Sequence, residues 1–240
     1  MIAHHSNLVI LSAAIAILGA FTACIMTSNL AALGRSERRG HLVMASAALG
    51  GSLWAMQFIG LLALDAPLNF AYNPVPLAIS AAAAFTGTTA SLLVLGARRT
   101  WYPARLPAAA IILGTAIAVT NYAGLFAVAG PRLSFLWFLT LVSIAVSVQV
   151  AAIALWFLFR RRGAIATLAG AGILGLCLSA THYMAIASAQ NLEQALLAVP
   201  AYGNAISERY LAWSVTIITY MICSICLCIF VVGQFRDEAG

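Results

Sequence analysis

Seven long stretches without a charged residue divide this chain, and they restrict its possible folds more than any other feature. They cover residues 1–34, 40–64, 66–97, 106–131, 133–159, 163–192 and 210–235. Each stretch is longer than the ~20 residues that a helix needs to cross the hydrocarbon core of a bilayer. A hydrophobic content of 63% and a mean hydropathy of +1.01 are typical of membrane proteins. The stretches lack polar–apolar alternation, so they predict an all-α integral membrane protein with seven transmembrane helices and exclude a β-barrel.

The arginines predict how the helices are oriented. The expected spans are 7–33, 41–64, 75–96, 106–129, 133–159, 164–189 and 209–235. All twelve basic residues are arginines. Ten of them fall on one side of these spans, and only Arg132 and Arg209 fall on the other. Because positive residues collect in the cytoplasm, we expect an external N-terminus and a cytoplasmic C-terminus. The first stretch is too long for a cleavable signal peptide, so we expect it to form the first span. Residues 1–240 are predicted to form one membrane domain without a soluble output domain.

A short polar cassette recurs near the end of the second, fourth and sixth spans. Its copies are Ala55-Met56-Gln57-Phe58-Ile59-Gly60-Leu61, Val119-Thr120-Asn121-Tyr122-Ala123-Gly124-Leu125 and Ala180-Thr181-His182-Tyr183-Met184-Ala185-Ile186. Residues 57 and 121 are 64 apart, and residues 121 and 182 are 61 apart. A repeat of two spans preserves orientation, so the chain is predicted to contain three parallel helical hairpins and one extra helix. The odd spans show a weaker echo, since Leu11-Ser12-Ala13-Ala14 resembles Ile79-Ser80-Ala81-Ala82.

The polar residues of the cassettes are expected to meet at one depth. Gln57 precedes Asp65 by eight residues, and His182 precedes Gln190 by eight. Both therefore lie ~12 Å inside the outer ends of their helices. Polar residues within a membrane usually have a function. The predicted cluster in the outer leaflet consists of Gln57, Thr120, Asn121, Tyr122, Thr181, His182 and Tyr183.

The cassettes resemble degenerate copies of the Met-His-Tyr-Thr signature of the MHYT domain, a seven-span bacterial membrane sensor. In that family the signature recurs near the outer ends of the second, fourth and sixth spans. The resemblance covers nearly the whole chain and implies a place in the bacterial inner membrane, with a periplasmic N-terminus. It also implies copper binding through Met and His, and sensing of a diatomic gas or redox signal. The family is often joined to domains that make or degrade cyclic di-GMP.

Only part of the expected ligand set of the signature is present. Met56 and His182 remain, and Met184 is a third candidate ligand for copper, whereas Gln57 and Asn121 replace the other two histidines. Copper(I) prefers thioether, thiolate and imidazole ligands, which the amides do not supply. Met184 lies about 200° around the helix from His182, so both cannot easily face one ion. The alternative is a hydrogen-bond cluster between helices that has no ligand.

Two further groups are secondary metal candidates. His4 and His5 lie near the external N-terminus, where a mobile solvated end is the alternative. Cys223 and Cys226, spaced by three, share a face of the seventh span and could bind copper or zinc. Their alternative role is that of small hydrophobic side chains.

These features favour a sensor or signalling protein that is not an enzyme. It would detect an external stimulus at the cluster and relay it to a separate signalling or membrane-complex protein. The alternative is an accessory or structural membrane subunit, or a copper-handling component, in which the cluster only packs helices. The basic pI of about 9.4 fits arginines beside anionic lipid of the bilayer and requires no nucleic acid. Gln149, midway along the fifth span, is expected to bond a neighbouring helix or to line a pathway.

Overall fold

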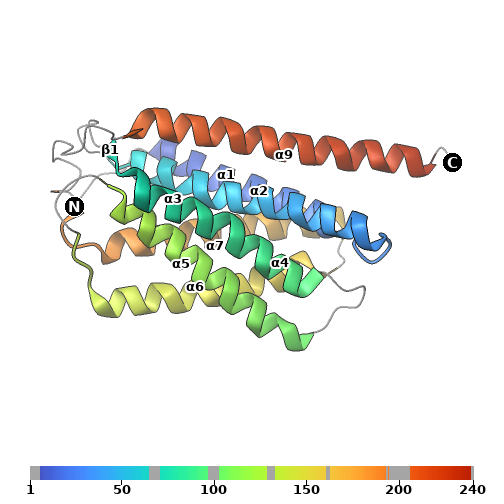
Figure 1. Cartoon of the computed structure of the whole chain (residues 1–240), viewed down its shortest axis with the longest axis horizontal. Helices are drawn as coiled ribbons and strands as arrows, with labels where there is room; N and C mark the ends of the chain where they lie inside the picture. The colour runs from blue at the N-terminus through green and yellow to red at the C-terminus, as the bar shows by residue number, and fades with distance from the viewer. Residues whose placement is uncertain are drawn as a thin grey trace.

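Seven long helices run alongside one another in the computed structural model (Figure 1). It describes residues 6–64, 71–96, 103–128, 133–160, 163–192, 194 and 206–238. The spans are α1 (Ser6–Thr27), α2 (Arg35–Leu62), Pro74–Gly96, α5 (Leu106–Phe126), α6 (Trp137–Leu158), α7 (Ala164–Ser188) and α9 (Glu208–Glu238). The third span joins α3 (Pro74–Ala82), the π-helical turn η1 (Ala83–Gly87) and α4 (Thr88–Gly96). All seven spans are long and apolar enough to cross a membrane, which confirms the predicted all-α seven-span fold.

Three span ends differ from the prediction by four residues or more. The second span starts at Arg35 rather than at 41, and the other two ends differ at polar contacts. The first span stops at Thr27, since Arg38 donates from its guanidinium to the carbonyls of Leu30 (3.1 Å) and Leu33 (2.9 Å) and holds the connection in a turn. The fifth span starts at Trp137 rather than 133. There the backbone before the helix is extended, and the amide of Leu136 donates to the carbonyl of Ser188 at 2.9 Å.

The spans form a ring in sequence order. Each of the first six contacts its neighbours in the chain, and α7 returns to pack against α1. The even-numbered spans α2, α5 and α7 also contact one another within this ring. In Figure 1, α9 lies along the outside of the bundle, where it packs on α1 and α2. Three hairpins around a shared centre, with one added helix, are the arrangement that the repeat predicts.

Small residues bring these helices close together. A Cβ added to Gly175 of α7 would lie 2.6 Å from the Cα of Ile17 in α1. A Cβ on Gly50 of α2 would lie 2.8 Å from the carbonyl oxygen of Ala84 in η1. Such contacts are typical of membrane bundles, where helices associate by close van der Waals packing of their backbones.

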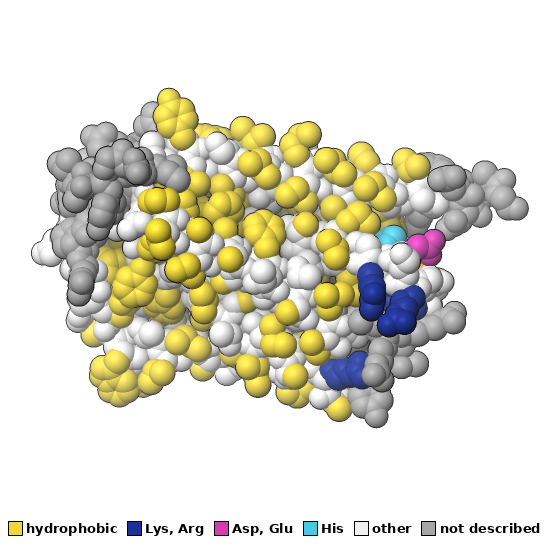
Figure 2. Space-filling model, viewed as in Figure 1, with side chains coloured by type: hydrophobic (Ala, Val, Ile, Leu, Met, Phe, Trp, Pro, Cys, Tyr) yellow, Lys and Arg dark blue, Asp and Glu magenta, His cyan; other side chains and the backbone are white. Residues whose placement is uncertain are grey.

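The two ends of the bundle differ in charge. The cassettes lie toward the C-terminal ends of α2, α5 and α7, and we call this the cassette end. The opposite end, the arginine end, carries Arg35, Arg39, Arg105 and Arg160. Figure 2 shows basic side chains gathered at that end and an apolar surface between the two ends. An apolar girdle of this kind fits the bilayer environment that the helices require.

Short backbone pairings link the connecting segments at the cassette end. Strand β1 (Ala71–Tyr72) pairs antiparallel with β2 (Ile206–Ser207), and Tyr72 also bridges Val128. Most of the chain between α7 and β2 lies outside the described residues.

Candidate functional site

The polar residues of the three cassettes lie at one level inside the bundle. Gln57 and Asn121 each precede the end of their helix by five residues, and His182 precedes the end of α7 by six. These offsets correspond to about 8–9 Å along the axis, slightly shallower than expected from the sequence. The three side chains are only 0%, 3% and 1% exposed. They come from helices that contact one another, and the convergence of all three on one site stays a prediction.

Two of these side chains pack onto a glycine of the neighbouring cassette. The Gln57 amide of α2 lies directly against Gly124 of α5, where an added Cβ would overlap it. The His182 imidazole of α7 lies against Gly60 of α2, and an added Cβ there would be 2.7 Å from Nε2. The direction is the same in both cases, from α7 to α2 and from α2 to α5. Gly60 therefore makes room for His182 of the third cassette, and Gly124 makes room for Gln57 of the first.

Gln57 also bonds the third span. Its Nε2 donates to Ser80 Oγ at 3.0 Å, and Ser80 Oγ donates to the carbonyl of Thr120 at 3.0 Å. Thr120 Oγ1 reaches the carbonyl of Ser80 at 3.4 Å. This chain of bonds ties α2, α3 and α5 together. Thr181 instead donates to its own helix, at the carbonyl of Leu178 (2.7 Å).

The cassette tyrosines bond serines on the next span around the ring. Tyr122 Oη lies 2.6 Å from Ser143 Oγ of α6 and 3.2 Å from Ser188 Oγ of α7. Tyr183 Oη lies 3.3 Å from Ser12 Oγ of α1. In the first cassette Phe58 replaces tyrosine, and Ser80 is bonded by Gln57 instead.

The serine partners form a repeat of their own. Ser12, Ser80 and Ser143 are all buried, and they are spaced by 68 and 63 residues. Ser12 and Ser80, the serines of the sequence echo, thus each bond a cassette residue, whereas Ser143 was missed. The interval alone does not identify it, because Ser147, 67 residues after Ser80, matches the first interval of 68 more closely.

Some polar atoms of the cluster have no hydrogen-bond partner. Within the described residues, Nδ1 and Nε2 of His182 and Oε1 of Gln57 are buried and unpartnered. Buried polar atoms are almost always bonded, so each exception requires an explanation. The His182 ring is also packed edge-on against Tyr183, with the ring centres 5.5 Å apart. Both nitrogens of the imidazole are therefore left without a hydrogen bond among the described residues.

The soft donors are Met56 and His182, on facing sides of α2 and α7. Ser179 Oγ lies 3.7 Å from Met56 Sδ, and Ser179 is one turn before His182 on α7. Met56 is likewise one turn before Gly60, which His182 contacts. The two donors are thus offset by roughly one helical turn, ~5 Å along the axis. Met184 is half-buried and points about 200° away from His182 around α7.

The secondary candidates do not gather into a metal centre in the described residues. No group of three His, Cys, Asp or Glu side chains comes together there. Cys223 and Cys226 are free thiols buried where α9 packs on the bundle, and Cys226 Sγ lies 3.8 Å from the carbonyl of Met44. His4 and His5 lie outside the described residues.

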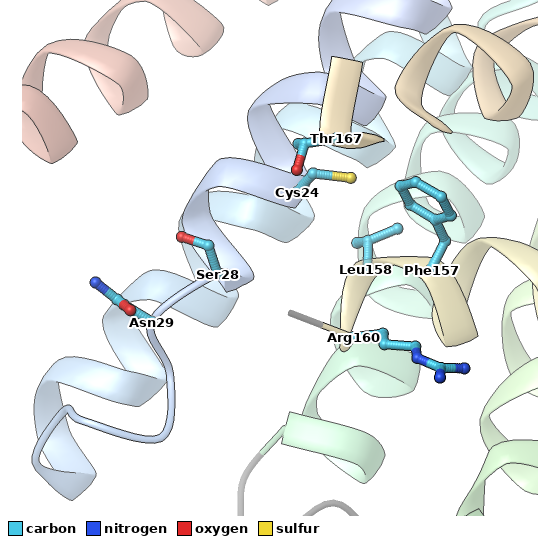
Figure 3. Close-up of a pocket in the computed structure, with 7 residues that line it drawn as sticks. All are labelled: Cys24, Ser28, Asn29, Phe157, Leu158, Arg160 and Thr167. Carbon is cyan, nitrogen blue, oxygen red and sulfur yellow. The ribbon is translucent and has the colours of Figure 1, made fainter. Parts of the chain in front are cut away.

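A cavity of about 210 Å³ lies at the arginine end, and Figure 3 shows the residues that line it. It opens between the end of α1, the end of α6 and the start of α7. Its lining residues are Cys24, Ser28, Asn29, Phe157, Leu158, Arg160 and Thr167. The Arg160 guanidinium is stacked on Trp156, 4.9 Å from the ring centre. None of the cassette residues lines this cavity.

Comparison with known proteins agrees with this arrangement. The family described as "Bacterial signalling protein N terminal repeat" (MHYT) matches residues 50–107 and 114–171, which contain the first two cassettes. The bifunctional diguanylate cyclase/cyclic di-GMP phosphodiesterase MucR of Pseudomonas aeruginosa is 29% identical over 245 residues, 98% of this chain and 35% of MucR. The signaling protein YkoW of Bacillus subtilis is 23% identical over 159 residues, 66% of this chain and 20% of YkoW. No solved structure matches significantly. The chain thus spans about a third or less of these relatives. Seven membrane-spanning helices, a cassette repeated on α2, α5 and α7, and two matched repeats show that the chain belongs to the MHYT family of bacterial signalling proteins.

Proposed function

We propose that this chain is the sensory module of a membrane signalling system and that its input site is the cassette cluster. The observation that carries the proposal is His182, which is fully buried, touches Gly60, and leaves both ring nitrogens unpartnered among the described residues. Burying an imidazole without a hydrogen bond is costly. A ligand that bonds His182 would offset that free-energy cost. Because His182 contacts Gly60, the ligand would also shift α2.

Copper(I) is the ligand that the remaining donors fit. The orphaned imidazole of His182 and the thioether of Met56 on the facing helix are both soft ligands. Two soft donors satisfy the low coordination numbers that this ion accepts. Gln57 and Asn121 would contribute little, so we propose one metal between α2 and α7 rather than a threefold site.

Helix α2 is the proposed route of the signal. It carries Met56 and Gly60 near the cassette end, and α9 is attached to it by a bond from Thr219 Oγ1 to the carbonyl of Gly51 at 3.2 Å. A shift of α2 would therefore reach α9 and the arginine end. We place the partner there, facing the cytoplasm, and the cassettes toward the periplasm. The name of MucR supports an enzyme of cyclic di-GMP turnover as the output.

The second candidate function is a purely structural one. Its support is the set of bonds from Gln57, Tyr122 and Tyr183 to serines on neighbouring helices, because such a network can hold a bundle together without a ligand. The protein would then be an accessory subunit of a membrane complex.

Metal titration of the purified protein under reducing conditions tests the site. We expect the wild type to bind one copper(I) ion, and His182→Ala and Met56→Leu each to weaken binding at least tenfold. Met26→Leu is the matched control, because Met26 is an equally buried methionine on α1. A wild type that binds no copper overturns the metal assignment, and binding that is unchanged in His182→Ala overturns the assignment of the site.

Cellular signalling separates the sensory role from the structural one. A His182→Gln variant that accumulates to the wild-type level should change the cyclic di-GMP concentration if the cluster is an input site. An unchanged concentration, with normal accumulation, would favour the structural role.

A further inference from the structure

Gln149 is a polar side chain that faces outward from the middle of α6. The sequence predicted a bond to a neighbouring helix or a place along a pathway, but Gln149 is exposed on the surface of the bundle and bonds no other helix among the described residues of this chain. Nine residues separate it from the end of α6 at Leu158, so it lies ~14 Å from the arginine end of that helix. This is close to the centre of a hydrocarbon core ~30 Å thick. An amide has two donors and one acceptor, and none of them finds a partner in lipid at this depth.

Thr115 of α5 lies at the same depth. It follows the start of α5 at Leu106 by nine residues, which again corresponds to ~14 Å from the arginine end. Thr115 is exposed. Neither Thr115 nor Gln149 forms a side-chain hydrogen bond within the described part of the chain.

The crossing of α5 and α6 places both side chains on one face. Gly114 is pressed against the backbone of Val148, where an added Cβ would overlap it, so the two helices are in close backbone contact at these residues. Thr115 and Gln149 each come one residue later and are turned by about 100° around their own axes. Because the two helices are antiparallel, these turns bring both side chains to the same side of the pair. The result is a polar spot at mid-membrane depth on an otherwise apolar face.

The surface around this spot suits a second helix. Leu141, Ala145, Gln149 and Ile153 recur every four residues along α6, and all four are exposed. Small residues such as Ala145 let helices approach closely, and polar side chains bond across membrane interfaces.

We propose that this face, the α5–α6 face, binds a second copy of the same chain. An amide is both a donor and an acceptor, so two Gln149 side chains related by a twofold axis along the membrane normal can donate to each other. Each Thr115 hydroxyl lies at the right depth to form a further hydrogen bond with the Gln149 amide of the second copy. The proposal does not depend on the function of the cassette cluster.

Dimerisation in lipid tests the proposal directly. The full-length chain, labelled with donor or acceptor fluorophores, is diluted in vesicles over a range of protein-to-lipid ratios, and energy transfer gives the dimer dissociation constant. We expect a wild-type dimer that Gln149→Leu weakens roughly tenfold, the effect of one to two interhelical bonds. Gln149→Asn should retain part of the affinity, and Ala145→Trp should weaken the dimer by blocking close approach.

Leu168→Trp is the matched control, since Leu168 faces lipid from α7 and is 61% exposed. It should leave the dimer intact. A wild type that stays monomeric at every ratio overturns the proposal, as does a dimer that is indifferent to both Gln149→Leu and Ala145→Trp. Equal weakening by Leu168→Trp overturns it as well, because the α5–α6 face would then have no special role. All three substituted positions are exposed, so monomer folding is checked by an unchanged melting temperature in detergent.

Discussion

At the scale of single residues, the bonds between cassette tyrosines and serines are the smallest units that hold neighbouring hairpins together. Tyr122 reaches serines on both α6 and α7, whereas Tyr183 reaches Ser12 of α1 at the longer distance of 3.3 Å. A hydrogen bond between membrane helices contributes on average about 0.6 kcal/mol. The two tyrosines should therefore differ in their contribution to stability.

Removing one hydroxyl at a time measures this difference. Tyr122→Phe should lower the free energy of unfolding by about 1 kcal/mol, because two serines lose a partner, and Tyr183→Phe should lower it by roughly half as much. Reversible unfolding in mixed micelles provides the measurement. Tyr220→Phe is the control for the same chemical change, since Tyr220 is 60% exposed on α9. Equal losses in all three variants would show that the serine contacts contribute nothing specific.

At the scale of elements, glycines decide how closely the helices approach. Gly172 and Gly175 lie one turn apart on α7 and differ only in their surroundings. An added Cβ at Gly175 meets the backbone of Ile17 in α1, whereas one at Gly172 meets nothing within 4 Å.

This contrast predicts opposite effects of the same substitution. Gly175→Ala should destabilise the protein by about 1–3 kcal/mol, the usual cost of overpacking, because α1 and α7 must separate. Gly172→Ala should be neutral or stabilising by about 0.5–1 kcal/mol, because alanine favours a helix interior over glycine. Melting temperatures of the two purified variants give the comparison. If Gly172→Ala were as damaging as Gly175→Ala, helix contact would not be the cause.

Only some positions of the polar side chains could be predicted from the sequence. The repeat predicted that Gln57 and His182 converge, since equal spacing places equivalent residues at equal depth. Ser143 was missed because it is followed by isoleucine, whereas Ser12 and Ser80 are each followed by two alanines. The outward position of Gln149 could not be predicted, because a membrane helix that is apolar all round has no periodicity to mark its inner face.

At the scale of the whole molecule, three hairpins enclose the cassettes at one end, and most arginines lie at the other. Arg35, Arg39, Arg105 and Arg160 lie at the arginine end, whereas Arg209 lies at the start of α9, at the cassette end. Charged residues of this kind stay on the cytoplasmic side because moving them across the bilayer is costly. The cassette end should therefore face the periplasm, which makes it accessible to an external stimulus.

Labelling with a membrane-impermeant maleimide tests this orientation. Val75→Cys introduces a thiol at the cassette end, where Val75 is 65% exposed, and Ser36→Cys introduces one at the arginine end, where Ser36 is exposed. We expect Val75→Cys to react in cells whose outer membrane alone is permeabilised, and Ser36→Cys to react only after the inner membrane is opened. The wild type is the control, because its five native cysteines all lie within the transmembrane helices and should remain unlabelled in intact cells. The reverse pattern would place the cassettes in the cytoplasm, and the proposed sensor would then respond to an internal signal.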